Sequence, residues 1–251
     1  MNSILISSVF FASIFAAALL GMAIRRSLPE EHVGSDAKEI VRLATGLIAT
    51  MAALVLGMLV SSAKSYYDSS KHDIEEVSSE IVSIDHLLAR FGPQSDEIRA
   101  EFRQLVELGL DRIWPNAASQ HADLRPGDHG QILVDKLVAL APQNEMQAAA
   151  KTQAISMINS LRQAQWRLFL RSQQKPIPLP LLAVLISWLA AIFASFGLFA
   201  PSNATVVATL ALSALAVSSA IFIILEMYTP FGGIMTISQV PMLEALKEMV
   251  R

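Results

Sequence analysis

Four long apolar blocks without charged residues alternate with polar segments along the chain. They cover residues 4–23, 43–62, 181–199 and 204–225. Each block is about long enough to cross a hydrocarbon core of about 30 Å as a helix that rises 1.5 Å per residue. The first block could be a cleaved signal peptide, but no Lys or Arg precedes it and its apolar stretch is long. The pattern therefore predicts four transmembrane helices.

The segment between the second and third blocks has the polar character of a soluble domain. An apolar stripe of heptad type begins it, with members spaced by three and four residues: Ile74, Val77, Ile81, Ile84 and Leu88. This spacing predicts an amphipathic helix. Gly92-Pro93 ends that helix, and Ser95 or Asp96 can start the next one. Further helices are expected up to Pro115, over residues 132–140 and over residues 144–173, and no convincing strand pattern is present.

The predicted fold is all-α, a polytopic membrane protein with a helical domain inserted between the second and third spans. The expected division is residues 1–63 for the first helix pair, 64–175 for the inserted domain, 176–228 for a membrane hairpin and 229–251 for a tail. The tail ends in an amphipathic piece, with apolar Met242, Leu243, Leu246 and Met249. We expect this piece to pack on the inserted domain, because it carries few positive charges that would hold it on a membrane surface.

Composition narrows the possible functions. The chain is 53% hydrophobic and 16% charged, against about 25% charged in soluble domains. It has no cysteine, which excludes disulfides and thiolate chemistry. A net charge of −3 without a basic tract gives no indication of nucleic-acid binding.

Positive charges beside the blocks bear on orientation. Four crossings place both termini and the inserted domain on one side. That side carries Lys64, Lys71, Arg167, Arg171, Lys175, Lys247 and Arg251, and the other side carries Arg25, Arg26, Lys38 and Arg42. The balance favours a cytoplasmic inserted domain, although the first block alone, followed by Arg25 and Arg26, favours the reverse.

No pattern indicates an enzyme, a cofactor or a metal. The chain contains no P-loop, nucleophile elbow, zinc-protease motif or dinucleotide fingerprint. One loop holds His121, Asp123, Asp128 and His129, but their spacing matches no recognised ligand pattern, so a solvated loop is favoured over a metal site. The blocks also lack ionisable residues before Glu226. This weakens an ion-coupled transporter but not a passive pore.

Small residues line one helical face of the second block. Gly46, Thr50, Ala53, Gly57, Ser61 and Lys64 recur by threes and fours. Such a face packs closely against a neighbouring helix, or it forms the narrow neck of a pore in an oligomer. Small-residue faces are common in membrane helix bundles, so the residue types alone favour helix packing over pore lining. The pore-lining candidates are Thr50, Ala53, Gly57, Ser61 and Lys64.

A second motif follows the fourth block. Pro230, Phe231, Gly232 and Gly233 form either a plain helix stop or a sharp turn that brings the tail back along the inserted domain.

Several stretches resemble the bacterial bestrophin-like membrane proteins. They are GMAIRRSLPEEH (residues 21–32), GLIATMAALVLGMLVSSAKSYYD (46–68), DRIWP (111–115), FASFGLFAPSNATVVA (193–208) and LEMYTPFGGIMTIS (225–238). A weaker resemblance extends to the bestrophin channels, through Ser65 to Asp68, Pro230 to Gly232 and Val240 to Leu246. This resemblance implies a homopentamer in the inner membrane of a bacterium, with a cytosolic helical body and a pore along the second span.

The resemblance has a limit at the Pro-Phe-Gly segment. Animal bestrophins follow it with an acidic cluster that binds calcium, whereas Gly233-Ile234-Met235-Thr236-Ile237 follows here. Calcium binding is therefore not implied. The leading hypothesis is a passive ion channel, with anions as the ion class, whose partners are the lipid bilayer and further copies of the chain. The alternative is a membrane scaffold or sensor without a pore, whose stripe from Ile74 to Leu88 binds a protein partner.

Overall fold

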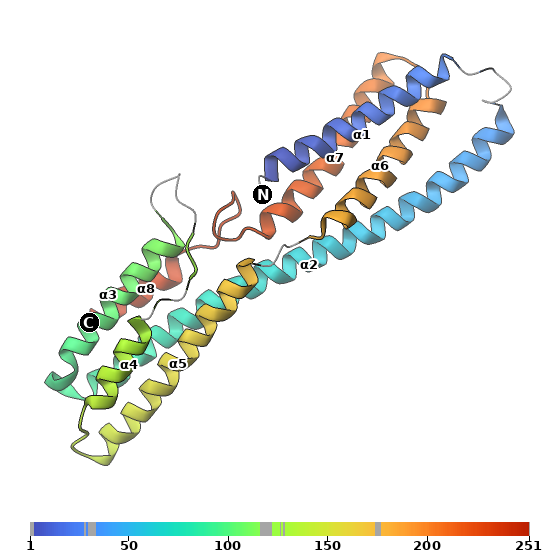
Figure 1. The fold of residues 1–251 in the computed structure, drawn as a ribbon. Helices are drawn as coiled ribbons and strands as arrows, with labels where there is room; N and C mark the ends of the chain where they lie inside the picture. Colours follow the sequence, from blue (N-terminus) through green and yellow to red (C-terminus); the bar gives the residue numbers. More distant parts are fainter. Residues whose placement is uncertain are drawn as a thin grey trace. The chain divides into compact units, whose positions relative to one another are not determined.

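The computed structural model describes residues 3–27, 29, 34–115, 122–125, 127, 129–173 and 177–250, and all regular structure in them is helical (Figure 1). The helices are α1 (Ser3–Arg25), α2 (Ser35–Ala89), α3 (Asp96–Ile113), α4 (His129–Ala139), α5 (Glu145–Gln173), α6 (Leu179–Phe199), α7 (Ala204–Met227) and α8 (Val240–Glu248). A short 3-10 turn, Gly92–Ser95, precedes α3. The all-α class is thus confirmed for the described part of the chain.

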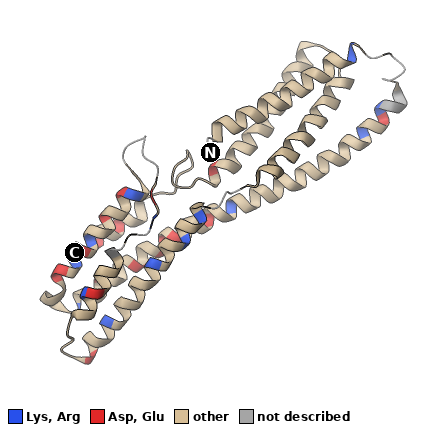
Figure 2. Ribbon diagram, viewed as in Figure 1, with Lys and Arg blue, Asp and Glu red and all other residues tan. Residues whose placement is uncertain are grey.

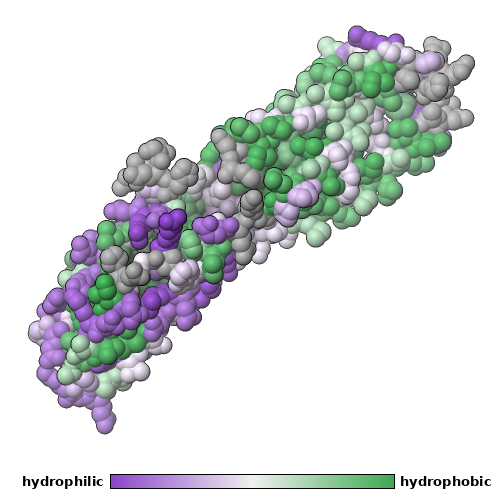
Figure 3. All heavy atoms as spheres, in the orientation of Figure 1, coloured by the Kyte–Doolittle hydropathy of each residue, from purple (hydrophilic) through white to green (hydrophobic). Residues whose placement is uncertain are grey.

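Four of these helices, α1, α2, α6 and α7, are long and apolar enough to cross a membrane. They correspond to the four apolar blocks of the sequence. The surface of their apolar parts is largely hydrophobic in Figure 3. Figure 2 shows charged residues near the ends of α1 and α7, at the start of α2 and along the second half of α2. The prediction of four long apolar helices is confirmed.

The chain forms two compact units. The first, here called the membrane unit, comprises Met1–Tyr66 and Pro176–Tyr228, and the second, here called the polar unit, comprises Tyr67–Lys175 and Thr229–Arg251. Helix α2 is continuous over 55 residues and contributes to both units. Charged residues are spread along the helices of the polar unit (Figure 2).

In the membrane unit, α1 packs closely on α6 at two glycines. A Cβ atom on Gly21 would overlap the carbonyl group of Ala194, and a Cβ atom on Gly197 would overlap that of Ala18. The two backbones are therefore in direct contact on both sides of the crossing. Close approach of this kind is how membrane helices gain packing energy when lipid is as apolar as their side chains.

Polar bonds fix the ends and edges of this helix group. The Arg25 guanidinium donates a hydrogen bond to the Ala200 carbonyl, which joins the end of α1 to the end of α6. The Asn203 side chain accepts a bond of 2.8 Å from the Val206 amide and so caps α7. Thr45 Oγ1 donates to Ser195 Oγ at 3.0 Å and ties α2 to α6.

The core of the polar unit is built on the stripe of α2. Val77, Ile81, Ile84 and Leu88 are all buried and share one cluster with residues of α3, α4, α5 and α8. Helix α8 contributes Met242, Ala245 and Met249 to this cluster. The tail therefore packs against the core that the end of α2 organises.

The connection from α2 to α3 turns at Gly92, whose φ of 68° lies in the left-handed region that glycine adopts without steric cost. Ser95 directly precedes α3, but its hydroxyl makes no capping bond to that helix. The single O–H of Ser95 instead points to two carbonyl oxygens, that of Leu88 at 2.7 Å and that of Gly92 at 2.9 Å from Oγ, and can donate to either. Through Leu88, Ser95 thus offers a donor to the end of α2, where carbonyls lack intrahelical partners.

A buried ion pair joins α2 to α3 beside this turn. Arg99 Nε donates to Asp85 Oδ1 at 2.9 Å, and Arg99 Nη2 donates to Asp85 Oδ2 at 2.8 Å. The Asp85 side chain is 4% exposed and that of Arg99 is 30% exposed. The hydrogen bonds from Arg99 to Asp85 raise the pKa of the guanidinium above its ordinary value, against the opposing effect of desolvation.

We predict that Gly21→Ala or Gly197→Ala destabilises the protein by about 1–3 kcal/mol, because the added methyl must force two backbones apart. The measurement is the thermal unfolding midpoint of the detergent-purified protein. Ala16→Leu is the control, since Ala16 lies on the exposed side of α1. Wild-type midpoints for both glycine variants would contradict the close contact.

We also predict an asymmetry at the ion pair. Arg99→Met leaves the buried Asp85 carboxylate without its cation and costs about 3 kcal/mol, as expected when one partner of a buried pair is removed. Asp85→Asn costs less, about 1 kcal/mol, because the more exposed Arg99 can be hydrated. Hydrogen exchange of peptides from residues 77–89 and 96–106 measures both losses. Equal losses in the two variants would show that burial of the carboxylate does not control the effect.

Candidate pore-lining face and tail junction

The small-residue face of α2 is exposed in the chain. Thr50, Ala53, Gly57, Ser61 and Lys64 all lie at the surface of the membrane unit. Apart from its chain neighbours and the backbone of its own helix, no atom lies within 4 Å of the position that a Cβ would take on Gly57, and the same holds for Gly46. Packing against another described helix of the same chain therefore does not account for this face.

A strip of large apolar residues borders the small face on α2. Leu47, Met51, Leu54 and Met58 are exposed by 66%, 48%, 66% and 73%. The opposite side of the helix is the covered one, with Thr45, Ala52, Leu59 and Ala63 buried. In the most apolar window of α2, 11% of the residues are buried, against 28% to 33% in the other three spans. Of the four spans, α2 is the one that its own chain covers least.

Two tyrosines make contacts at the C-terminal end of the part of α2 that belongs to the membrane unit. Tyr228, which follows α7, donates from its hydroxyl to Ser62 Oγ at 2.9 Å. Its ring lies 5.4 Å from that of Tyr66. Glu226 at the end of α7 is 4% exposed. These contacts fix the end of the small face relative to α7, within the membrane unit.

The turn motif lies in the polar unit. Pro230 is buried, and its carbonyl accepts a bond of 2.8 Å from the Ile237 amide, which closes the loop. The Gly232 amide donates to the Thr229 carbonyl at 3.2 Å. Among the described glycines only Gly92 has a positive φ, so the turn at Gly232 does not depend on a left-handed conformation.

Two motifs far apart in the sequence meet at this turn. Trp114 Nε1 donates to the Ile237 carbonyl at 2.9 Å, and the Trp114 ring meets Phe231 edge to face, at 6.1 Å between centroids and 76° between planes. Ile237 is buried in a cluster with Ile74 and Leu168. We call Trp114, Phe231 and Ile237 the tail junction. The sequence predicted no contact for Trp114, which stood out only beside the helix-ending Pro115 and within the DRIWP stretch of the family resemblance.

No group of three or more His, Asp or Glu side chains that could hold a metal is found in the described part of the chain. The loop considered for such a site falls partly beyond that part. His121 and Asp128 are outside the described residues, as is the side chain of His129. Asp123 accepts a bond of 3.0 Å from the Arg125 amide, which is a local turn interaction.

A family model for the Bestrophin-like domain matches residues 12–242. The chain therefore belongs to the bestrophin-like family, and its four apolar helices of membrane-crossing length fit a membrane protein. No curated protein and no solved structure matches the chain significantly.

For the tail junction, we predict that Trp114→Phe costs about 1 kcal/mol, since the ring stays but the indole hydrogen bond is lost. The loosened tail should be cleaved faster by trypsin after Lys247, and the rate of this cleavage is the measurement. Trp166→Phe is the matched control, because Trp166 is half exposed and packs against Phe169 on its own helix. An unchanged cleavage rate in Trp114→Phe would mean that the bond does not hold the tail.

Proposed function

We propose that the protein is an oligomeric passive ion channel in which α2 of each subunit lines a central pore. The observation that supports this most strongly is the exposed, uncharged face of Thr50, Ala53, Gly57 and Ser61 on a helix that its own chain leaves mostly uncovered. The face of a single α2 helix cannot enclose a pore by itself. Several copies around an axis would form a narrow passage of small and hydroxyl side chains.

The two exposed strips of α2 suit two different surroundings. Large apolar side chains such as Leu54 and Met58 are at no disadvantage against lipid or an apolar neighbour. Small side chains contribute little to such contacts but leave room for ions or water. With the large strip toward a neighbouring subunit or lipid, the small strip faces the axis, and the neck lies near Gly57 and Ser61. Apolar and hydroxyl linings of this kind conduct and can gate by dewetting.

Family membership supports the remaining parts of the proposal. A homopentamer in the inner membrane of a bacterium, with the polar unit and both termini in the cytoplasm, agrees with the resemblance to bestrophin channels and with the charges that flank the spans. Anions as the permeating ions rest on that resemblance alone.

The scaffold alternative loses its main support. The stripe from Ile74 to Leu88 was the surface expected to bind a protein partner, but its residues are at most 6% exposed within the polar unit. A partner would have to displace the core of the unit to reach them.

We expect purified protein in liposomes to pass ions, and Gly57→Trp to abolish the flux, because the indole would fill the narrowest part of the passage. Met58→Trp is the matched control on the neighbouring strip and should still conduct. Ion flux is followed under applied voltage and at several pH values. No flux from the wild type under any of these conditions, or equal flux from wild type and Gly57→Trp, would reject the pore.

The mass of the detergent-purified particle provides an independent test. A pore shared along α2 requires an assembly around an axis, for which the family resemblance implies five copies. A particle of one or two chains could not enclose such a passage, whatever the flux assay gives.

A further inference from the structure

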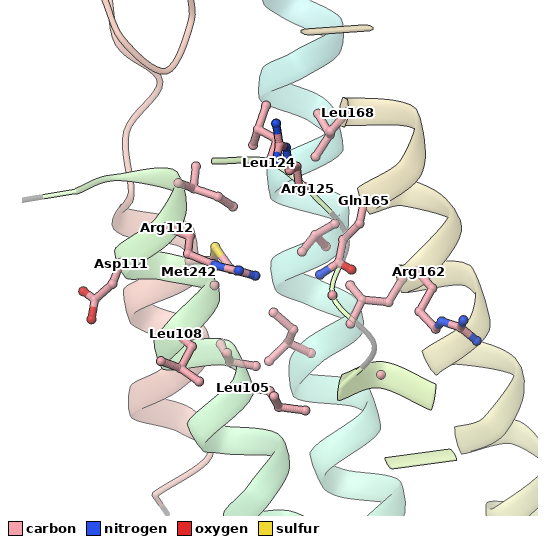
Figure 4. Close-up of a pocket in the computed structure, with 18 of the residues that line it drawn as sticks. Leu105, Leu108, Asp111, Arg112, Leu124, Arg125, Arg162, Gln165, Leu168 and Met242 are labelled. Carbon is pink, nitrogen blue, oxygen red and sulfur yellow. The ribbon is translucent and has the colours of Figure 1, made fainter. Parts of the chain in front are cut away.

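The polar unit contains a cavity of about 560 Å³ that neither the proposed pore nor the tail junction explains. Five helices contribute to its wall, α2, α3, α4, α5 and α8 (Figure 4). Protein interiors seldom leave voids much larger than a water molecule, and ligand pockets fall between about 300 and 1,000 Å³. The volume lies within the range of small-molecule sites.

Most of the cavity wall is apolar. The buried wall residues include Val77 and Ile81 of α2, Phe102 and Val106 of α3, and Ile158 of α5. Along α3 the lining runs from Phe102 to Arg112, which is about 15 Å at 1.5 Å per residue. Water gains few hydrogen bonds in such a space, whereas an apolar chain would fill it.

The lining also carries the polar side chains Asp111, Arg112, Asp123, Arg125, Arg162 and Gln165. Figure 4 shows the Arg112 side chain reaching into the cavity from α3 and the Gln165 amide facing it from α5. Asp111 and Arg162 point away in the same view. Arg162 is already engaged, since its Nη1 donates to Gln131 at 2.8 Å. Among the described residues, none forms a hydrogen bond or ion pair with the guanidinium of Arg112.

We propose that this cavity binds a single-chain amphiphile with an anionic head, of the fatty-acid type. The hydrocarbon chain lies along the apolar wall between Phe102 and Ile158. The carboxylate lies at the other end, where Arg112 donates charge-assisted hydrogen bonds and Gln165 supplies an amide donor. A guanidinium matches a carboxylate in charge and in its two-pronged geometry.

The test is photolabelling of the full-length protein in its membrane with palmitic acid that carries a diazirine on its chain. Mass spectrometry then locates the label. We expect labelled peptides from α3 and α5, competition by excess palmitate, and weaker labelling by the corresponding fatty alcohol. Label confined to the membrane unit, that is to α1, α6, α7 and α2 before Tyr67, would overturn the proposal. Equal labelling by acid and alcohol would overturn the role of the anionic head.

A filling variant separates loss of binding from loss of fold. Gly109 lies on the cavity wall in α3, and nothing lies within 4 Å of the position of its Cβ. Gly109→Phe should occupy the cavity without a backbone clash, and replacing a glycine inside a helix removes an entropic cost of folding. We expect this variant to fold and to lose the label. Full labelling of a folded Gly109→Phe protein would overturn the site.

A charge variant tests the head group. Arg112→Gln should weaken labelling by the acid about tenfold or more, as expected for loss of a hydrogen bond to a charged group, and leave labelling by the alcohol unchanged. Arg103→Gln is the matched control, because Arg103 is on the same helix, does not line the cavity and pairs with Glu107 at 3.1 Å. An unaltered preference for the acid in Arg112→Gln would contradict the assignment. The readout is binding, so it is independent of whether the protein conducts ions.

Discussion

The packing of α2 is the constraint on which the interpretation of the membrane unit depends. This helix is apolar enough to cross a membrane, yet its own chain covers it less than the other three spans. The contact between α1 and α6 shows what small residues do when they pack within this chain, since Gly21 and Gly197 bring two backbones together. Gly46 and Gly57 of α2 have open space instead. The same residue type thus makes a close helix contact in α1 and α6 but has no such partner among the described helices in α2.

Helix α2 also limits how the polar unit can be built. Its continuation from Tyr67 to Ala89 supplies the stripe around which α3, α4, α5 and α8 pack. Because the stripe is buried in one cluster with these helices, the apolar faces of α3, α4, α5 and α8 turn toward it. It also explains why the tail packs on the unit at Met242 and Met249, because those side chains complete the same core.

The sequence was sufficient to predict elements and insufficient to predict their partners. Four uncharged apolar runs indicate spans because a charge in the hydrocarbon core is costly, and the spacing of Ile74 to Leu88 indicates a buried helix face. A lone Gly21 or Gly197 inside an apolar run does not reveal which helix it approaches. Trp114 and Ile237 are more than a hundred residues apart, and neither carries a local signal of their hydrogen bond.

The same reasoning explains why the small face was visible in the sequence but its surroundings were not. Periodicity places Thr50, Ala53, Gly57 and Ser61 on one side of α2, and this much follows from 3.6 residues per turn. Whether that side is covered depends on α1, α6 and α7, which are distant in sequence. A cavity is harder still to foresee, because it is the space left between side chains of five helices.

The cavity and the tail junction share two supporting side chains. Ile74 and Leu168 line the cavity and also pack in the cluster that contains Trp114, Phe231 and Ile237. Leu168 lies three residues beyond Gln165 on α5, so these side chains are near the end of the cavity that is proposed to hold the head group. Through these two side chains the turn motif therefore packs against one part of the cavity wall, which is a contact that a plain helix stop would not need.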